Sequence, residues 1–123
     1  MPLPRFGDLE AAVMERLWSY HRPVNVREVL EDLRRDRKIA YTTVMTVMDK
    51  LYTKGWLRRT RVGRAYVYEP AASRESYTAR LMREALGASD NPAAAFVHFL
   101  ADLSPAEAEA LRAALKIVPP DGS

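Results

Sequence analysis

The stretch from residue 41 to residue 53 is the feature that most restricts how this chain can fold. Its apolar residues follow the i, i+3, i+4, i+7 spacing of one helical face: Val44, Val47, Met48 and Leu51. On a helical wheel of about 100° per residue, three residues border this stripe: Tyr41, Met45 and Tyr52. The opposite arc is polar: Thr42, Thr43, Thr46, Asp49, Lys50 and Thr53. The pattern predicts a helix with one buried face and one exposed polar face.

The polar face carries several threonines, although threonine is a poor helix former because its branched side chain loses rotamer freedom. A threonine hydroxyl can reach a base edge or a phosphate, and its methyl group can touch thymine. Residues 37–64 also hold eight Lys or Arg against one acid, a net charge of +7, whereas the whole chain has +3. This concentration of charge favours a nucleic-acid partner over a neutral solvent-exposed face.

Residues 54–70 predict the end of this helix and a two-stranded basic wing. Gly55 suits the left-handed residue that ends a helix. Two extended runs follow, residues 57–62 and 64–69, and the second alternates small and aromatic side chains with a period of two. The expected turn between them, Val62-Gly63, is not the Asn-Gly or Asp-Gly that favours a tight hairpin.

Two further helices are predicted upstream. The first runs from Asp8 to about Tyr20, and the second opens at Asn25, which forms a capping-box pattern with Glu28. Two helices, a short charged connector, the polar-faced helix and a hairpin make a winged helix-turn-helix. We therefore expect a mainly α (α+β) fold with a winged helix-turn-helix DNA-binding domain and a two-stranded wing over residues 1–72.

The remainder of the chain has a different composition. Residues 1–72 carry a net charge of +5 and residues 73–123 a net charge of −2. Helix starts at Ser73, Asn91 and Ser104 predict three helices, which are too few to bury a core of their own. Their apolar faces either pack on the winged domain or pair with a second copy.

We favour pairing in a homodimer, because one recognition helix contacts few bases and a two-fold symmetric dimer presents two such helices to the DNA. Residues 73–123 are therefore expected to form a three-helix C-terminal dimerisation region. The predicted dimerisation residues are Leu81, Phe96, Phe99, Leu100, Leu111 and Leu115.

Several segments carry a family resemblance: residues 7–14, Leu17-Trp18, residues 26–30, residues 39–48 and residues 63–66. In these segments the chain resembles the BlaI/MecI penicillinase-repressor family, and most closely its actinobacterial branch. The resemblance covers residues 6 to about 116. It implies a cytoplasmic, dimeric transcriptional repressor whose recognition helix enters the major groove of a palindromic operator in double-stranded DNA.

Matching positions imply that the threonines of the recognition helix contact bases or neighbouring phosphates and that the wing lies on the DNA backbone. The predicted DNA-binding residues are Tyr41, Thr42, Thr43, Thr46, Lys50, Arg61 and Arg64. In the family, a membrane metalloprotease sensor of the BlaR/MecR type responds to β-lactam, and the repressor is then cleaved at an Asn-Phe bond. The nearest equivalent here is Ala95-Phe96. The hypothesis is derepression by proteolysis near Phe96 after a cell-envelope or β-lactam signal, a role in antibiotic resistance.

Other chemistry finds little support in the sequence. The chain has no cysteine, and His21 and His98 lack ligand spacing, so we expect no metal site and no cofactor. No phosphate-binding loop and no nucleophile beside a histidine are present, so we expect no enzyme activity. No run reaches the length of a membrane span, and residues 1–4 do not resemble a signal sequence, so we expect a cytoplasmic protein without membrane insertion.

Two alternative functions remain open. The chain could bind a small apolar effector where the wing meets the tail, near residues 93–95, or act as a protein-interaction module without operator specificity.

Asp49 is expected to pair with Lys50 or Lys54 on the helix surface. Four aromatic residues are interpreted as core: Trp18, Trp56, Phe96 and Phe99.

Overall fold

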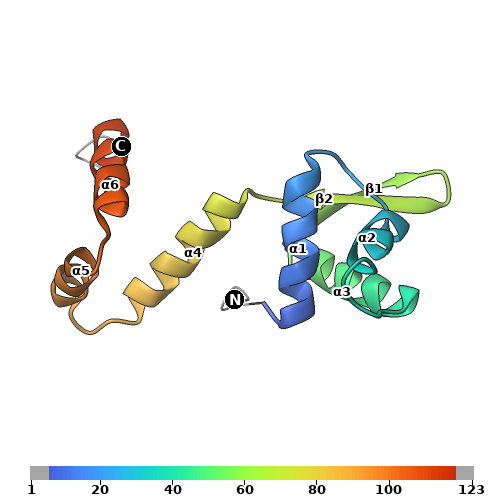
Figure 1. Cartoon of the computed structure of the whole chain (residues 1–123), viewed down its shortest axis with the longest axis horizontal. Helices are drawn as coiled ribbons and strands as arrows, with labels where there is room; N and C mark the ends of the chain where they lie inside the picture. Colours follow the sequence, from blue (N-terminus) through green and yellow to red (C-terminus); the bar gives the residue numbers. More distant parts are fainter. Residues whose placement is uncertain (1–5, 119–123) are drawn as a thin grey trace. The chain divides into compact units, whose positions relative to one another are not determined.

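The computed structural model describes residues 6–118, and its elements follow the predicted order (Figure 1). The helices and strands are α1 (Asp8–Tyr20), α2 (Val26–Leu33), α3 (Tyr41–Thr53), β1 (Leu57–Val62), β2 (Ala65–Pro70), α4 (Arg74–Gly87), α5 (Pro92–Ala101) and α6 (Pro105–Ile117). β1 and β2 pair antiparallel as a two-stranded sheet, which confirms a winged helix followed by three helices. The first four residues, on which the expectation about a signal sequence depends, lie outside the described residues.

The chain divides into two compact units, Met1–Leu81 and Met82–Ser123. The division lies inside α4, so the first unit contains the winged helix and the beginning of α4. The role of residues 73–123 as a dimerisation region remains a prediction. Within residues 6–118, no helix has both the length and the apolar character needed to cross a membrane.

The core of the first unit is formed by one face of each of the first three helices and by the base of the hairpin. Its buried members include Val13, Met14, Leu17, Val29, Leu30, Leu33, Val44, Met48, Leu51, Leu57 and Tyr68. Complete burial of one aliphatic side chain stabilises a fold by about 1.5–3 kcal/mol, so this cluster is the main source of stability for the unit.

A short β-bridge fastens the base of the wing to the segment between α1 and α2. The backbone N–H of Val24 donates to the carbonyl of Tyr68 at 2.9 Å, and the N–H of Tyr68 donates to the carbonyl of Val24 at 2.7 Å. Both side chains are buried. The hairpin is therefore continuous with the helical core at its base.

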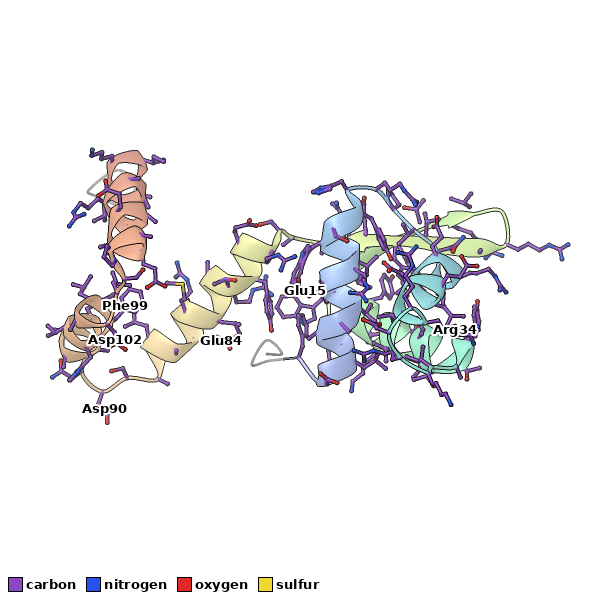
Figure 2. All side chains as sticks on the ribbon, in the orientation of Figure 1. Glu15, Arg34, Glu84, Asp90, Phe99 and Asp102 are labelled. Atoms are coloured by element: carbon purple, nitrogen blue, oxygen red, sulfur yellow. The ribbon has the colours of Figure 1, made fainter. Side chains whose placement is uncertain are left out.

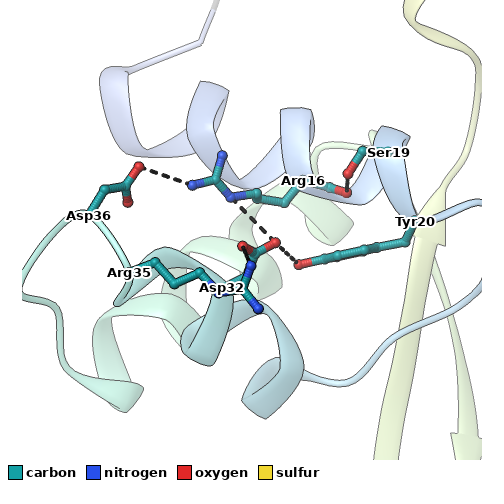
Figure 3. Close-up of polar contacts among 6 residues, drawn as sticks. All are labelled: Arg16, Ser19, Tyr20, Asp32, Arg35 and Asp36. Carbon is teal, nitrogen blue, oxygen red and sulfur yellow. Dashed lines mark hydrogen bonds and ion pairs between the residues drawn. The ribbon is translucent and has the colours of Figure 1, made fainter.

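A polar network joins α1 to α2 (Figure 3). The Tyr20 hydroxyl donates to Asp32 Oδ2 at 2.6 Å, and Arg16 lies 3.5 Å from Asp32 and 3.2 Å from Asp36. Burial raises the pKa of the Tyr20 phenol, and the hydrogen bond to Asp32 raises it further. The phenol therefore loses its proton only at a higher pH than an ordinary tyrosine and keeps donating to α2 until then.

Side-chain caps begin α2, α4, α5 and α6 at the predicted positions. Asn25 and Glu28 form a reciprocal capping box at α2, with both hydrogen bonds at 2.9 Å. The backbone N–H of Asn25 lowers the pKa of the Glu28 carboxyl, an effect that exceeds the opposing effect of burial. Ser73 and Asn91 accept hydrogen bonds at the starts of α4 and α5, and Ser104 forms a second capping box at α6. These caps satisfy backbone N–H groups that have no partner inside the helix.

An aromatic cluster attaches the beginning of α4 to the winged helix. Tyr77 is buried, stacks on Phe6 with ring centroids 4.5 Å apart, and meets the edge of Trp56 at 4.6 Å. Trp18 packs nearby, and its Nε1 donates to the carbonyl of Ala72 at 3.0 Å. The interpretation of Trp18 and Trp56 as core residues is confirmed, since both pack against the buried cluster.

The second unit lacks a buried core like that of the first unit, because no residue of α5 or α6 is buried. Large apolar side chains stay about half exposed: Phe96 50%, Phe99 46%, Leu100 51% and Leu115 67%. Figure 2 draws these side chains and labels Phe99 on α5. The interpretation of Phe96 and Phe99 as core is therefore wrong for the single chain. Leu111 is half-buried, whereas Leu81 belongs to the first unit and packs against its core.

Replacement of Tyr77 tests the aromatic cluster. We expect Tyr77→Ala to lower the free energy of unfolding by about 3–5 kcal/mol, because a large ring would leave a cavity among three other aromatic residues. Urea unfolding followed by tryptophan fluorescence measures this loss. The control is Thr78→Ala, one residue later and exposed, which should change the stability by less than about 0.5 kcal/mol. Equal stability of the two variants would contradict the role of the cluster.

Candidate nucleic-acid interface

The two faces of α3 differ as the helical spacing predicts. Val44, Met48 and Leu51 are completely buried against the core. The opposite face is exposed and consists of the predicted contact residues Thr42, Thr43, Thr46 and Lys50. These side chains project from a rigid helix, so their relative positions are fixed by the backbone.

The start of α3 is held by residues of α2 and of the connector. The guanidinium of Arg27 lies 5.7 Å from the centroid of the Tyr41 ring, and Arg34 Nε donates to the carbonyl of Ile39 at 3.1 Å. Figure 2 labels Arg34 at the outside of this helix pair. Tyr41 stays partly exposed beside the threonine face, where the prediction placed it.

The end of α3 is fixed by a glycine and by an ion pair to α1. Gly55 has φ +88°, the left-handed conformation predicted for it, and Lys54 Nζ lies 3.1 Å from Glu10 Oε2. Burial raises the pKa of the Glu10 carboxyl, but hydrogen bonds from the Gly7 N–H and Lys54 lower it more. The expected pairing of Asp49 with a lysine is wrong, because Asp49 pairs with Arg59 of β1 at 3.2 Å.

The wing ends in a two-residue turn, Gly63-Arg64, since Val62 pairs with Ala65. The expected turn was one residue too early. Of the two turn residues only Gly63 has a positive φ, +63°, as the first position of a type II′ turn requires. Arg61 and Arg64 are both exposed at this tip, and Arg61 Nε donates to the Gly63 carbonyl at 3.2 Å.

The basic stretch separates into paired and unpaired cations. Three of its eight cations have carboxylate partners: Lys54 with Glu10, Arg58 with Glu69, and Arg59 with Asp49. The other five form no ion pair with any carboxylate in residues 6–118: Arg37, Lys38, Lys50, Arg61 and Arg64. Lys50 lies on α3 and the two arginines lie at the wing tip, so unpaired positive charge is found on both proposed contact elements.

One residue of the site was not predicted. Arg59 lies between the rings of Tyr52 and Tyr66, 3.9 and 4.1 Å from their centroids, and thus contacts both α3 and β2. The signal that could have identified it is the strand register, which places Tyr66 diagonally across from Arg59 once the two-residue turn is known.

The described residues give little support to other ligand sites. No group of three or more His, Cys, Asp or Glu side chains in residues 6–118 is arranged to hold a metal ion. An open cleft in the first unit lies beside the segment from β2 to α4, with Arg22, Arg58 and Arg74 among its lining residues. Each of these arginines is paired with a glutamate, and residues 93–95 do not line the cleft.

A sequence model described as penicillinase repressor matches residues 6–117. The chain is 45% identical over 116 residues to the transcriptional regulator BlaI of Mycobacterium tuberculosis, covering 92% of this chain and 84% of that protein. It is 31% identical over 75 residues to the penicillinase repressor of Bacillus licheniformis, covering 61% of this chain and 58% of that protein.

A solved structure is similar to the first part of the fold. It is the solution structure of the DNA binding domain of the repressor BlaI, with a TM-score of 0.53 and 31% sequence identity. The similarity covers 63% of this chain and 94% of that domain.

Proposed function

Because the chain belongs to the penicillinase repressor family, we propose that it is a transcriptional repressor that binds double-stranded operator DNA as a homodimer. The observation that carries the proposal is the exposed threonine face of α3, accompanied by unpaired cations on the helix and on the wing tip. α3 enters the major groove, where the threonines meet base edges, and the wing lies on the phosphates.

The unpaired cations supply the electrostatic part of the affinity. Each phosphate contact releases roughly 0.9 counterion from duplex DNA, so binding weakens as the salt concentration rises. If all five cations made contact, the logarithm of the affinity would fall by about 4.5 per decade of salt for each protomer. The threonines add the sequence preference that phosphate contacts lack.

The apolar side chains of the second unit support a homodimer. Phe96, Phe99, Leu100 and Leu115 are about half exposed in the single chain, and burial of such surface contributes about 25 cal/mol per Å². A second copy would cover these residues and bring two recognition helices to half-sites about one turn of DNA apart. A palindromic operator matches that symmetry, and repression then follows from occupancy of the promoter.

Fluorescence anisotropy with the protein's own upstream promoter DNA and with a scrambled duplex tests this function. At two salt concentrations we expect tight, salt-sensitive binding of two chains per site, with a clear preference for the promoter. Equal or negligible binding to both duplexes would contradict operator recognition and favour a protein-interaction module.

The threonine face has its own test. We expect Thr46→Ala to reduce the preference for operator over scrambled DNA by about 1–3 kcal/mol, because the hydroxyl and methyl contacts to a base are lost. Competition binding with both duplexes measures the preference. Thr78→Ala, exposed on α4, should leave it unchanged. An unchanged preference in Thr46→Ala would remove this residue from base recognition.

Introduction of a charged residue at the proposed dimer interface tests the homodimer. We expect Phe99→Asp to sediment as a monomer and to bind the operator at least about tenfold more weakly, because burial of an unpaired carboxylate is unfavourable. Sedimentation equilibrium measures the mass. The control is Asp90→Lys, an exposed charge change in the loop before α5, which should remain dimeric. A Phe99→Asp protein that stays dimeric would place the interface elsewhere.

Derepression is proposed to occur by proteolysis at Ala95-Phe96 after a cell-envelope or β-lactam signal, delivered by a membrane metalloprotease of the BlaR/MecR type. The bond lies inside α5, a helix without buried residues, and Phe96 is half exposed. Where the second copy does not cover Phe96, local opening of such a helix costs little free energy, so a protease could reach the bond. A dimer that survives incubation with the cognate protease would exclude this route.

A further inference from the structure

Arg59 connects the recognition helix to the wing through contacts with both elements. Its guanidinium carbon lies 3.9 Å from the centroid of the Tyr52 ring and 4.1 Å from that of the Tyr66 ring. Its Nη1 also donates to Asp49 Oδ1 at 3.2 Å. Asp49 and Tyr52 belong to α3, whereas Tyr66 belongs to β2. A single side chain of β1 therefore contacts both elements of the candidate interface.

The strand register explains how Arg59 reaches Tyr66. Arg59 pairs with Tyr68, and Arg61 pairs with Tyr66. Tyr66 is thus the diagonal neighbour of Arg59 on the same face of the hairpin, within reach of a long side chain. The Arg59 side chain extends along the hairpin toward its tip.

Besides Arg59, one further contact links the outer part of the wing to the core in residues 6–118: the Tyr66 ring meets the ring of buried Tyr68 with centroids 6.5 Å apart. Leu57 and Tyr68 are buried at the base of the hairpin, but every residue from 60 to 66 is exposed. An isolated two-stranded hairpin is only marginally stable in water. The Arg59 contacts therefore bear directly on where Arg61 and Arg64 lie relative to α3.

The chemistry of Arg59 suits positioning rather than contact with DNA. A planar guanidinium can stack on two rings while its edge donates to a carboxylate, which the compact ammonium of lysine cannot do. The Arg59 side chain is only 23% exposed, and Asp49 offsets its charge. It is therefore a poor partner for a phosphate.

We propose that Arg59 is a positioning residue that clamps the wing to α3, so that Arg61 and Arg64 meet the DNA backbone while α3 occupies the groove. The proposal rests on the proposed function, operator binding. It assigns to Asp49, Tyr52 and Tyr66 the role of holding the Arg59 guanidinium.

A double-mutant cycle tests the clamp on the full-length protein. Loss of one phosphate contact per protomer in Arg64→Ala should weaken operator binding about eightfold for each protomer at 0.1 M salt, from the release of roughly 0.9 counterion per contact. In an Arg59→Lys background, where the charge is kept but the stacking is lost, Arg64→Ala should cost less than about twofold, because the misplaced wing no longer makes the contact. Tyr66→Leu removes one of the two rings that hold the Arg59 guanidinium and should give the same result.

Arg58→Lys is the matched control. Arg58 is the preceding residue of β1, and it pairs with Glu69 at 3.2 Å instead of contacting α3. In this background Arg64→Ala should keep its full effect, roughly eightfold for each protomer. Equal effects of Arg64→Ala in the wild-type, Arg58→Lys and Arg59→Lys proteins would overturn the clamp.

A spectroscopic measurement tests the clamp without DNA. In a ¹H–¹⁵N NMR spectrum, the ring currents of Tyr52 and Tyr66 should shift the Arg59 side-chain Hε resonance upfield of the resonances of arginines that lie over no ring, and Tyr66→Leu should reduce the shift. A resonance at the ordinary position would overturn the clamp. If the resonance were shifted but the wild-type protein did not prefer its promoter, the proposed function would fail, and the role of the clamp in DNA binding would fail with it.

Discussion

Burial of the apolar stripe of α3 is the interaction on which the rest of the molecule depends. Val44, Met48 and Leu51 are completely buried, and together they contribute about 5–9 kcal/mol at about 1.5–3 kcal/mol each. Rotation of the helix by one residue would expose them and would turn a charged side chain, Lys50 or Asp49, toward the core, which costs further free energy. The polar face therefore points outward because the core determines the rotation of the helix. A surface suited to base edges is thus a consequence of hydrophobic packing.

Carboxylates decide which cations of the basic stretch are structural and which are available to a ligand. Glu10 ties Lys54 to α1, and Asp49 ties Arg59 to α3, so these two cations fix the ends of the recognition helix and the wing. Exposed ion pairs of this kind contribute little stability, typically less than about 1 kcal/mol, so their effect is mainly geometric. The five cations without a carboxylate partner in residues 6–118 remain available to phosphates. A count of basic residues alone overstates the charge that a DNA duplex would meet.

Local patterns in the sequence predicted the elements well, whereas contacts between elements were harder to predict. Helix periodicity, capping residues and Gly55 act within a few residues, and the structure confirms them. The pairing of Asp49 with Arg59 depends on the hairpin folding back beside α3, so an interpretation restricted to one helix chose the wrong cation. The turn was misplaced by one residue because strand pairing sets the loop, and Tyr77 belongs to the first core because α4 begins against Trp56. Helical spacing alone is enough to predict the exposed threonines, whereas prediction of the Arg59 clamp requires the strand register of the hairpin.

The two units differ in how completely they bury their apolar residues. The second unit leaves apolar surface exposed that a partner would have to cover, whereas the first buries its own. The first unit has a closed core to which each of its helices and both strands contribute buried residues. In α5 and α6 the largest apolar side chains stay about half exposed, although their caps and spacing are those of well-formed helices. Capping contributes only about 1 kcal/mol per helix end, so it cannot replace a core. A symmetric partner would supply the missing surface and would also provide a second recognition helix. The same apolar contacts would then determine both the stability of the second unit and the number of bases that are recognised.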